Sequence, residues 1–97
     1  MTLSKHKMFL LEFSYELTSK EWKELIFVFD IPKGQAEKIT SAVDLLMYLE
    51  EVALLKKGKY DELRTATATI KRLDLVAKID DHIRSENNYG KDDYLGC

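Results

Sequence analysis

The sequence predicts an all-α protein that folds as a six-helix antiparallel bundle. Apolar residues recur with the 3.6-residue period of an α-helix along most of the chain, and only short segments separate the five or six stretches that this period marks. The composition fits one globular domain, because 97 residues with 45% hydrophobic and 33% charged residues can bury a single core without metal or disulfide support.

The first helix is expected over residues 5–17, where four apolar side chains stand at helical spacing: Phe9, Leu10, Phe13 and Leu17. Thr18 or Ser19 then offers an N-cap for a second helix. Glu21 follows in the first turn of that helix, where the helix dipole favours an acidic side chain.

The second helix has one apolar face and one aromatic residue on the opposite side. The spacing i, i+3, i+4, i+7 aligns Trp22, Leu25, Ile26 and Phe29. Phe27 lies off this face. Residues 25–29 alone would also fit a buried strand, but the charged, helix-favouring residues that precede them favour a helix. The helix ends before Pro32, since the residue before a proline is pushed out of helical geometry.

A short third helix over residues 35–39 leads to Ser41, which is a plausible N-cap for the fourth. The fourth helix carries a long core stripe at helical spacing: Ala42, Leu45, Leu46, Leu49, Val52 and Ala53. Residues 54–59 are expected to form a loop that begins with two apolar anchors.

The fifth helix is predicted over residues 60–71 and aligns Leu63, Ala66 and Ile70. Asp74 can cap a sixth helix, which aligns Leu75, Val76, Ile79 and Ile83. Residues 86–97 show no periodic face. We therefore expect one domain over residues 1–85, followed by a polar tail or linker.

The charge balance favours protein partners. The net charge is −2, from 15 basic and 17 acidic residues, whereas nucleic-acid binders usually carry a basic excess. A small basic patch stays open as an alternative. The single cysteine, Cys97, fits a reducing cytoplasmic setting, and no apolar stretch is long enough for a signal peptide or a membrane span.

No catalytic site, cofactor or metal is expected in this chain. The only two histidines, His6 and His82, lack metal-ligand spacing with another His or Cys. An acid–base cluster of His82 with Asp80 and Asp81 is conceivable, but neighbouring residues on a helix point apart, so a solvated helix end is favoured. The glycines are isolated, and Tyr89 and Tyr94 fall in the predicted tail.

The junction of the fifth and sixth helices narrows the choice of fold. Residues 71–76 read Lys-Arg-Leu-Asp-Leu-Val, which resembles the Arg-x-Asp-Leu motif of death effector domains. Residues 17–28 resemble that family's second helix, residues 30–33 its following loop, and residues 41–51 its fourth helix. The resemblance covers roughly residues 6–84 in the family's order and implies a death-fold bundle.

The resemblance also implies sites. Glu21, Arg72 and Asp74 match the family's charge triad, a surface network whose guanidinium can hold two carboxylates. The alternative is that Arg72 and Asp74 are only a helix end and a helix cap. An exposed hydrophobic patch would contain Phe27, with Val28 and Leu63 as neighbours. Lys33 and Lys38 stand where relatives carry a denser basic surface.

Two departures from the family's pattern concern these sites. The loop after the second helix is shorter than in many relatives. The fifth helix carries alternating threonine and alanine over residues 65–69 where leucines are common. Small and β-branched residues lower helix propensity and make the patch around Phe27 less apolar.

The resemblance implies homotypic binding between death effector domains in apoptotic, death-receptor signalling. The chain would be part of an adaptor or an initiator caspase, act in the cytoplasm, and self-associate into oligomers or filaments. One alternative is an inhibitory, caspase-like or viral-type decoy. Another, from a different class, is a helical nucleic-acid-binding or scaffold domain in which the Arg72 motif is coincidental.

Overall fold

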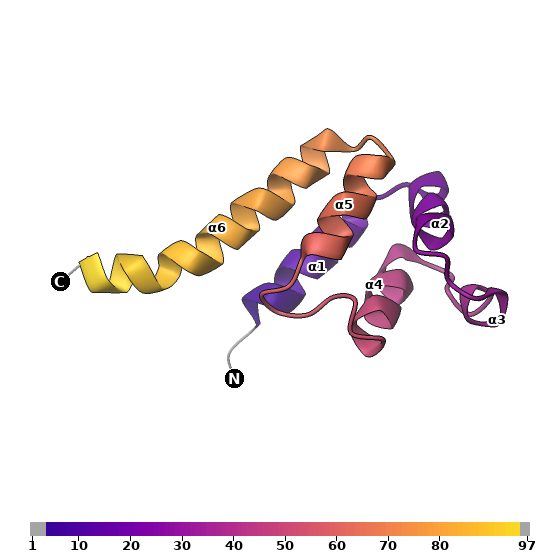
Figure 1. Cartoon of the computed structure of the whole chain (residues 1–97), viewed down its shortest axis with the longest axis horizontal. Helices are drawn as coiled ribbons and strands as arrows, with labels where there is room; N and C mark the ends of the chain where they lie inside the picture. Colours follow the sequence, from indigo (N-terminus) through magenta and orange to yellow (C-terminus); the bar gives the residue numbers. More distant parts are fainter. Residues whose placement is uncertain (1–3, 96–97) are drawn as a thin grey trace.

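The computed structural model describes the backbone of residues 4–95 and the side chains of residues 4–86 (Figure 1). This part of the chain forms six helices and no strand: α1 (Lys5–Glu16), α2 (Ser19–Val28), α3 (Lys33–Ala36), α4 (Ala42–Glu51), α5 (Asp61–Thr69) and α6 (Leu73–Leu95). The predicted all-α class is confirmed. Cys97 and the side chains of Tyr89 and Tyr94 lie outside the described residues.

One apolar core joins five of the helices. α1 packs against α4 and α6, while α2 packs against α4 and α5, and α5 lies beside α6. Side chains from every one of these helices, and from the loop before α5, are almost fully buried in the core: Phe13, Leu25, Leu45, Leu49, Leu55, Tyr60, Leu63, Leu75 and Ile79. α3 itself buries no residue, so it stands on the rim of the bundle.

Side-chain caps fix where three helices begin. Ser4 caps α1 and Ser41 caps α4 through the backbone N–H groups of Lys7 and Asp44, each at 3.2 Å. Thr18 caps α2, and Glu21 accepts a hydrogen bond from the Thr18 N–H in return. This reciprocal capping box satisfies two N–H groups that a helix start would otherwise leave open.

Three helices end on a residue with positive φ that is not glycine. Asp30 (φ 54°), Ala53 (φ 65°) and Lys71 (φ 66°) follow α2, α4 and α5. The next N–H in each case reaches back to a carbonyl in the last turn, at 3.2 Å from Ile31 to Ile26, 2.9 Å from Leu54 to Leu49 and 3.2 Å from Arg72 to Thr67. These are Schellman motifs, which turn the chain sharply at the end of each helix.

Several predicted boundaries are wrong. α3 begins directly after Pro32 and ends at Ala36, because proline's fixed φ suits a helix start. The stripe of α4 stops at Leu49, because the left-handed turn at Ala53 leaves Val52 and Ala53 exposed outside the helix.

The last two helices also depart from their predicted bounds. α5 is shorter than residues 60–71, and α6 begins at Leu73 rather than being capped by Asp74. α6 continues to Leu95, so the backbone past residue 85 is helical rather than irregular. The division of the chain into residues 1–85 and a tail stays a prediction.

Candidate interaction surfaces

Arg72 joins three segments of the chain. Its guanidinium donates to both carboxylate oxygens of Asp74, from Nε at 2.9 Å and from Nη2 at 2.8 Å. Nη1 donates to Glu21 Oε1 at 2.5 Å and to the backbone carbonyl of Glu16 at 3.0 Å. The structure therefore brings the predicted triad together, and adds a carbonyl at the end of α1 that the sequence did not indicate.

Glu21 serves the start of α2 and the network at once. Its Oε1 accepts from the backbone N–H of Thr18 at 2.9 Å as well as from Arg72. Partial burial raises the pKa of this carboxyl, but the hydrogen bonds from Arg72 and Thr18 outweigh burial, and the pKa falls below its ordinary value. The carboxylate is therefore ionised at neutral pH and fixes Arg72 to the first turn of α2.

Asp74 is the exposed end of the network. The hydrogen bonds from Arg72 lower the pKa of its carboxyl to about 2, and the two carboxylates together raise the pKa of the guanidinium. Arg72 thus ties the end of α1, the start of α2 and the start of α6 to one another. This geometry replaces the alternative in which Arg72 and Asp74 only end and cap helices.

Phe27 is an aromatic side chain that the fold leaves outside. It is 86% exposed on α2, and the neighbouring Val28 is 38% exposed. A shallow groove of about 470 Å³ lies beside it, lined from α2 and from the end of α5 by Lys20, Lys23, Glu24, Phe27, Val28, Thr69 and Ile70.

The assignment of Leu63 to this patch is wrong. Leu63 is 0% exposed and belongs to the core, because it lies on the face of α5 that also buries Ala66. The residues beside Phe27 at the end of α5 are instead Thr69, its last residue, and Ile70, which follows it. Lys33 and Lys38, the predicted basic surface, are both exposed at α3, Lys33 within the helix and Lys38 just after it.

A second groove, of about 380 Å³, lies between α1 and α4. Its lining is largely apolar: Lys7, Leu10, Leu11, Val43, Leu46, Met47 and Glu50. Leu11 is 44% and Met47 is 60% exposed, so apolar surface is left open along it. The exposure of Leu11 and Met47 could have been predicted from the sequence, since both residues lie off the core stripes of their helices. The groove itself could not, because the periodic pattern does not say which two helices meet.

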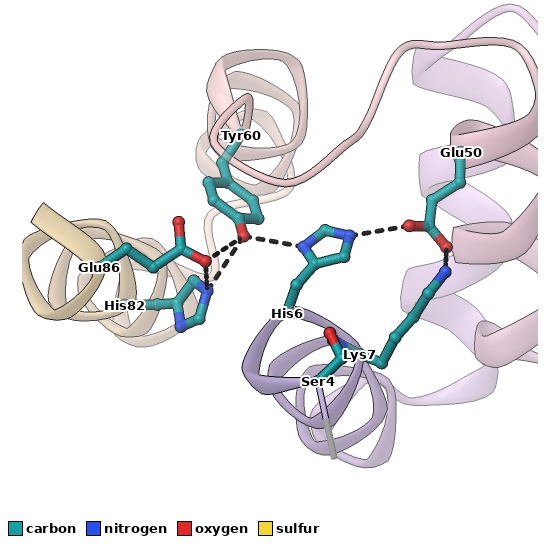
Figure 2. Close-up of polar contacts among 7 residues, drawn as sticks. All are labelled: Ser4, His6, Lys7, Glu50, Tyr60, His82 and Glu86. Carbon is teal, nitrogen blue, oxygen red and sulfur yellow. Dashed lines mark hydrogen bonds and ion pairs between the residues drawn. The ribbon is translucent and has the colours of Figure 1, made fainter. Parts of the chain in front are cut away.

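Both histidines belong to a polar network inside the bundle (Figure 2). His6 is 4% exposed and bridges Glu50 of α4, from Nε2 at 2.7 Å, and the hydroxyl of Tyr60, from Nδ1 at 2.8 Å. The Tyr60 hydroxyl also contacts His82 Nε2 at 3.0 Å and Glu86 Oε2 at 2.9 Å, both on α6.

The predicted solvated helix end at His82 is therefore wrong. Its ring stacks on Phe9 with centroids 4.1 Å apart and an interplanar angle of 5°. Asp80 pairs instead with Arg64, and Asp81 with Arg84. Spacing alone could not reveal this network, because its members come from four different elements of the fold.

Two further properties of the described residues limit the sites. These residues contain no group of three or more His, Cys, Asp or Glu side chains that could hold a metal ion. None of the helices within them combines the length and apolarity needed to cross a membrane.

Comparisons with known proteins agree with the predicted family. A family model described as the death effector domain matches residues 6–85. That span contains Glu21, Phe27, Arg72 and both grooves. No curated protein matches the chain.

Proposed function

Because the chain belongs to the death effector domain family, we propose that it binds other death effector domains through Phe27 and through the groove between α1 and α4. Domains of this family mediate homotypic protein–protein interactions in death signalling. Beyond this property of the family, the proposal names the two surfaces of this chain that would make the contact.

The exposure of Phe27 is the observation that carries the proposal. An aromatic side chain that is 86% exposed gains nothing from the core of its own domain. Burial of such a ring in a partner's pocket typically contributes about 2–4 kcal/mol at the centre of an interface. Val28 and the apolar part of the adjoining groove extend the surface that a partner can cover.

The groove between α1 and α4 supplies a complementary surface on another part of the molecule. Leu11 and Met47 leave apolar area open there, and the groove of about 380 Å³ is large enough to receive an aromatic side chain. A protrusion on one surface that fits a groove on a different surface makes a heterologous contact. Such contacts repeat from copy to copy, which supports self-association into oligomers or filaments.

The Arg72 network orients the binding surface. Arg72 holds the first turn of α2 through Glu21, and Phe27 lies on the same helix. A rigid α2 presents Phe27 in one direction relative to α5 and α6. The network therefore contributes to binding by preorganisation, which lowers the entropy lost when two domains associate.

The proposal assigns recruitment rather than catalysis to this chain. It acts as the interaction module of an adaptor or an initiator caspase in apoptotic signalling, in the cytoplasm. Family membership and the two exposed apolar surfaces support this role. Any catalytic step would then belong to a partner or to another domain.

The test compares Phe27→Ala with Tyr15→Ala by light scattering and by pulldown with purified death effector domains. Tyr15 is a matched control, since it is a 72% exposed aromatic on α1 that lines neither groove. We expect Phe27→Ala to lose self-association and to bind other death effector domains more weakly than the wild type, because it keeps only the groove, while Tyr15→Ala keeps both. A folded Phe27→Ala protein that binds like the wild type would refute the proposed surface.

A further inference from the structure

The network around Tyr60 has fewer protons than its contacts require when both histidines are neutral and both carboxyl groups are ionised. It runs from Lys7 and Glu50 through His6 and Tyr60 to His82 and Glu86, across α1, α4, the start of α5 and α6 (Figure 2). Every contact in it joins two polar atoms at 2.6–3.0 Å. Each such contact needs a proton on one of its two atoms, although one N–H can be shared between two acceptors.

The protons that the contacts require can be assigned beginning at Glu50. Its Oε1 accepts from Lys7 Nζ at 2.6 Å, and its Oε2 contacts His6 Nε2 at 2.7 Å. Burial raises the pKa of Glu50, but the hydrogen bonds from Lys7 and His6 outweigh it and lower the pKa. The group is therefore an acceptor-only carboxylate, and His6 Nε2 must carry a proton.

Tyr60 then faces two acceptors with one hydroxyl proton. If His6 is neutral, its proton is on Nε2 and its Nδ1 is a lone pair that accepts from Tyr60 at 2.8 Å. An ionised Glu86, whose Oε2 lies 2.9 Å from the same hydroxyl, needs that proton too. Burial and the nearby Glu86 raise the pKa of Tyr60, so the phenol keeps its one proton but has no second to give.

His82 does not resolve the shortage. A proton on its Nε2 can serve the contacts to Tyr60 at 3.0 Å and to Glu86 at 2.9 Å. The contact between His6 and Tyr60, or the one between Tyr60 and Glu86, still lacks a donor. Two opposed lone pairs at that distance in a buried site are strongly unfavourable.

We propose that the folded network binds one additional proton, carried by His6 or by Glu86, and that this proton clamps the first turn of α1 to α4 and α6. With the proton on His6, both of its nitrogens donate and Tyr60 donates to Glu86. With the proton on Glu86, that carboxyl donates to Tyr60 and Tyr60 donates to His6. The two arrangements differ by the position of the protons along one chain of hydrogen bonds, and both satisfy every contact.

The charges around the network favour an added proton. The titratable and charged groups that face His6 and Tyr60 are Lys7 of α1, Glu50 of α4, and His82 and Glu86 of α6. The two carboxylates outnumber the one permanent cation when both histidines are neutral. One added proton makes this group of charges neutral in sum, which lowers the cost of keeping the carboxylates of Glu50 and Glu86 largely out of solvent.

The proposal makes folding dependent on pH above neutrality. An imidazole in an unfolded chain releases its proton near pH 6.5, whereas the folded network retains one. The folded state then binds more protons than the unfolded state, so stability falls as pH rises. The stabilisation is complete below about pH 6.5 and is lost as pH rises through the value at which the folded network releases its proton.

The test measures urea unfolding at pH 7.0 and pH 8.5, at a concentration at which the chain is monomeric. We expect the unfolding equilibrium constant to rise about 25-fold in the wild type, as one bound proton requires over this pH interval, and to change less than about twofold in His6→Gln and Tyr60→Phe. Tyr60→Phe keeps the ring in the core, so it remains folded if His6→Gln does not. Tyr15→Phe is the matched control, because Tyr15 is an exposed tyrosine outside the network, and it keeps the wild-type dependence.

A direct reading comes from the nitrogen chemical shifts of His6 and the carboxyl shift of Glu86 at pH 7.5. A doubly protonated His6 or a protonated Glu86 supports the proposal. A neutral His6 beside an ionised Glu86 overturns it. Equal pH dependence of unfolding in the wild type and in Tyr60→Phe overturns it as well.

Discussion

Arg72 uses three nitrogen atoms to make four hydrogen bonds, to Asp74, Glu21 and the carbonyl of Glu16. The planar fork of a guanidinium permits this arrangement, and the single ammonium of lysine does not. Replacement of Arg72 by lysine keeps the positive charge but removes the planar fork, so it measures how much the hydrogen-bond geometry contributes beyond the charge.

We predict that Arg72→Lys lowers the free energy of unfolding by about 1–2 kcal/mol, after allowance for the partial exposure of the network. Arg84→Lys is the control, because Arg84 makes an exposed ion pair with Asp81 one turn away, and its change should stay within about 0.5 kcal/mol. Urea denaturation measures both. Equal losses in the two variants would contradict a specific role for the fork of Arg72.

The dependence of stability on pH below pH 5 tests the carboxylates of Asp74 and Glu21. The pKa of Asp74 is lowered to about 2 and that of Glu21 is also lowered, whereas unfolded Asp and Glu titrate near pH 4. A lowered folded pKa stabilises the protein above the unfolded value, and the stabilisation is lost as pH falls. We therefore expect the difference in unfolding free energy between the wild type and Arg72→Gln to shrink from pH 5 to pH 2. A constant difference over this range would contradict the ionic network.

Single residues differ in how far the sequence predicts their environment. Glu21, Arg72 and Asp74 were predictable because the resemblance to death effector domains carried that family's charge triad onto these three positions. The surroundings of His6 were not, because no motif or resemblance linked it to its partners Glu50 and Tyr60, which are 44 and 54 residues away in the sequence. Their meeting depends on how α1, α4 and the loop before α5 pack.

At the scale of the helix, the three Schellman turns place residues other than glycine in the left-handed region. A residue with a Cβ atom pays an energetic penalty there, whereas glycine adopts this conformation freely. Ala53 is the best position at which to measure this penalty, since its side chain is small and exposed and its removal disturbs no core packing.

We predict that Ala53→Gly raises the free energy of unfolding by about 0.5 kcal/mol, since relief of strain exceeds the added entropy of the unfolded chain. The same substitution in the interior of α6, Ala77→Gly, should lower it by about 1 kcal/mol. Thermal or urea unfolding distinguishes the two signs. A loss of stability in both variants would show that Ala53 is not strained.

Helix interiors were easier to predict than helix ends. The period of apolar residues located five of the six helices, because each buries a stripe in the core. α3 buries no residue, so its limits depend on Pro32 and on local turns rather than on a stripe. The end of α4 was misplaced because Val52 and Ala53 continue the period after the backbone has already turned at Ala53.

At the scale of the whole molecule, two open apolar surfaces lie on different pairs of helices. Phe27 and Val28 project beside the groove between α2 and α5, while Leu11 and Met47 line the groove between α1 and α4. The sequence predicted the first surface, because Phe27 falls off the core face of its helix. It did not predict the second, since a groove exists only once two helices are packed.

Mixing two complementary variants tests homotypic binding through these surfaces most directly. Phe27→Ala keeps the groove and lacks the aromatic side chain, whereas Met47→Lys keeps the aromatic side chain and blocks the groove. Met47 is 60% exposed, so lysine is tolerated there. Sedimentation velocity should show each variant alone as a monomer, an equimolar mixture as a dimer and nothing larger, and the wild type as longer oligomers. A mixture that stays monomeric, or a single variant that assembles like the wild type, would contradict the account.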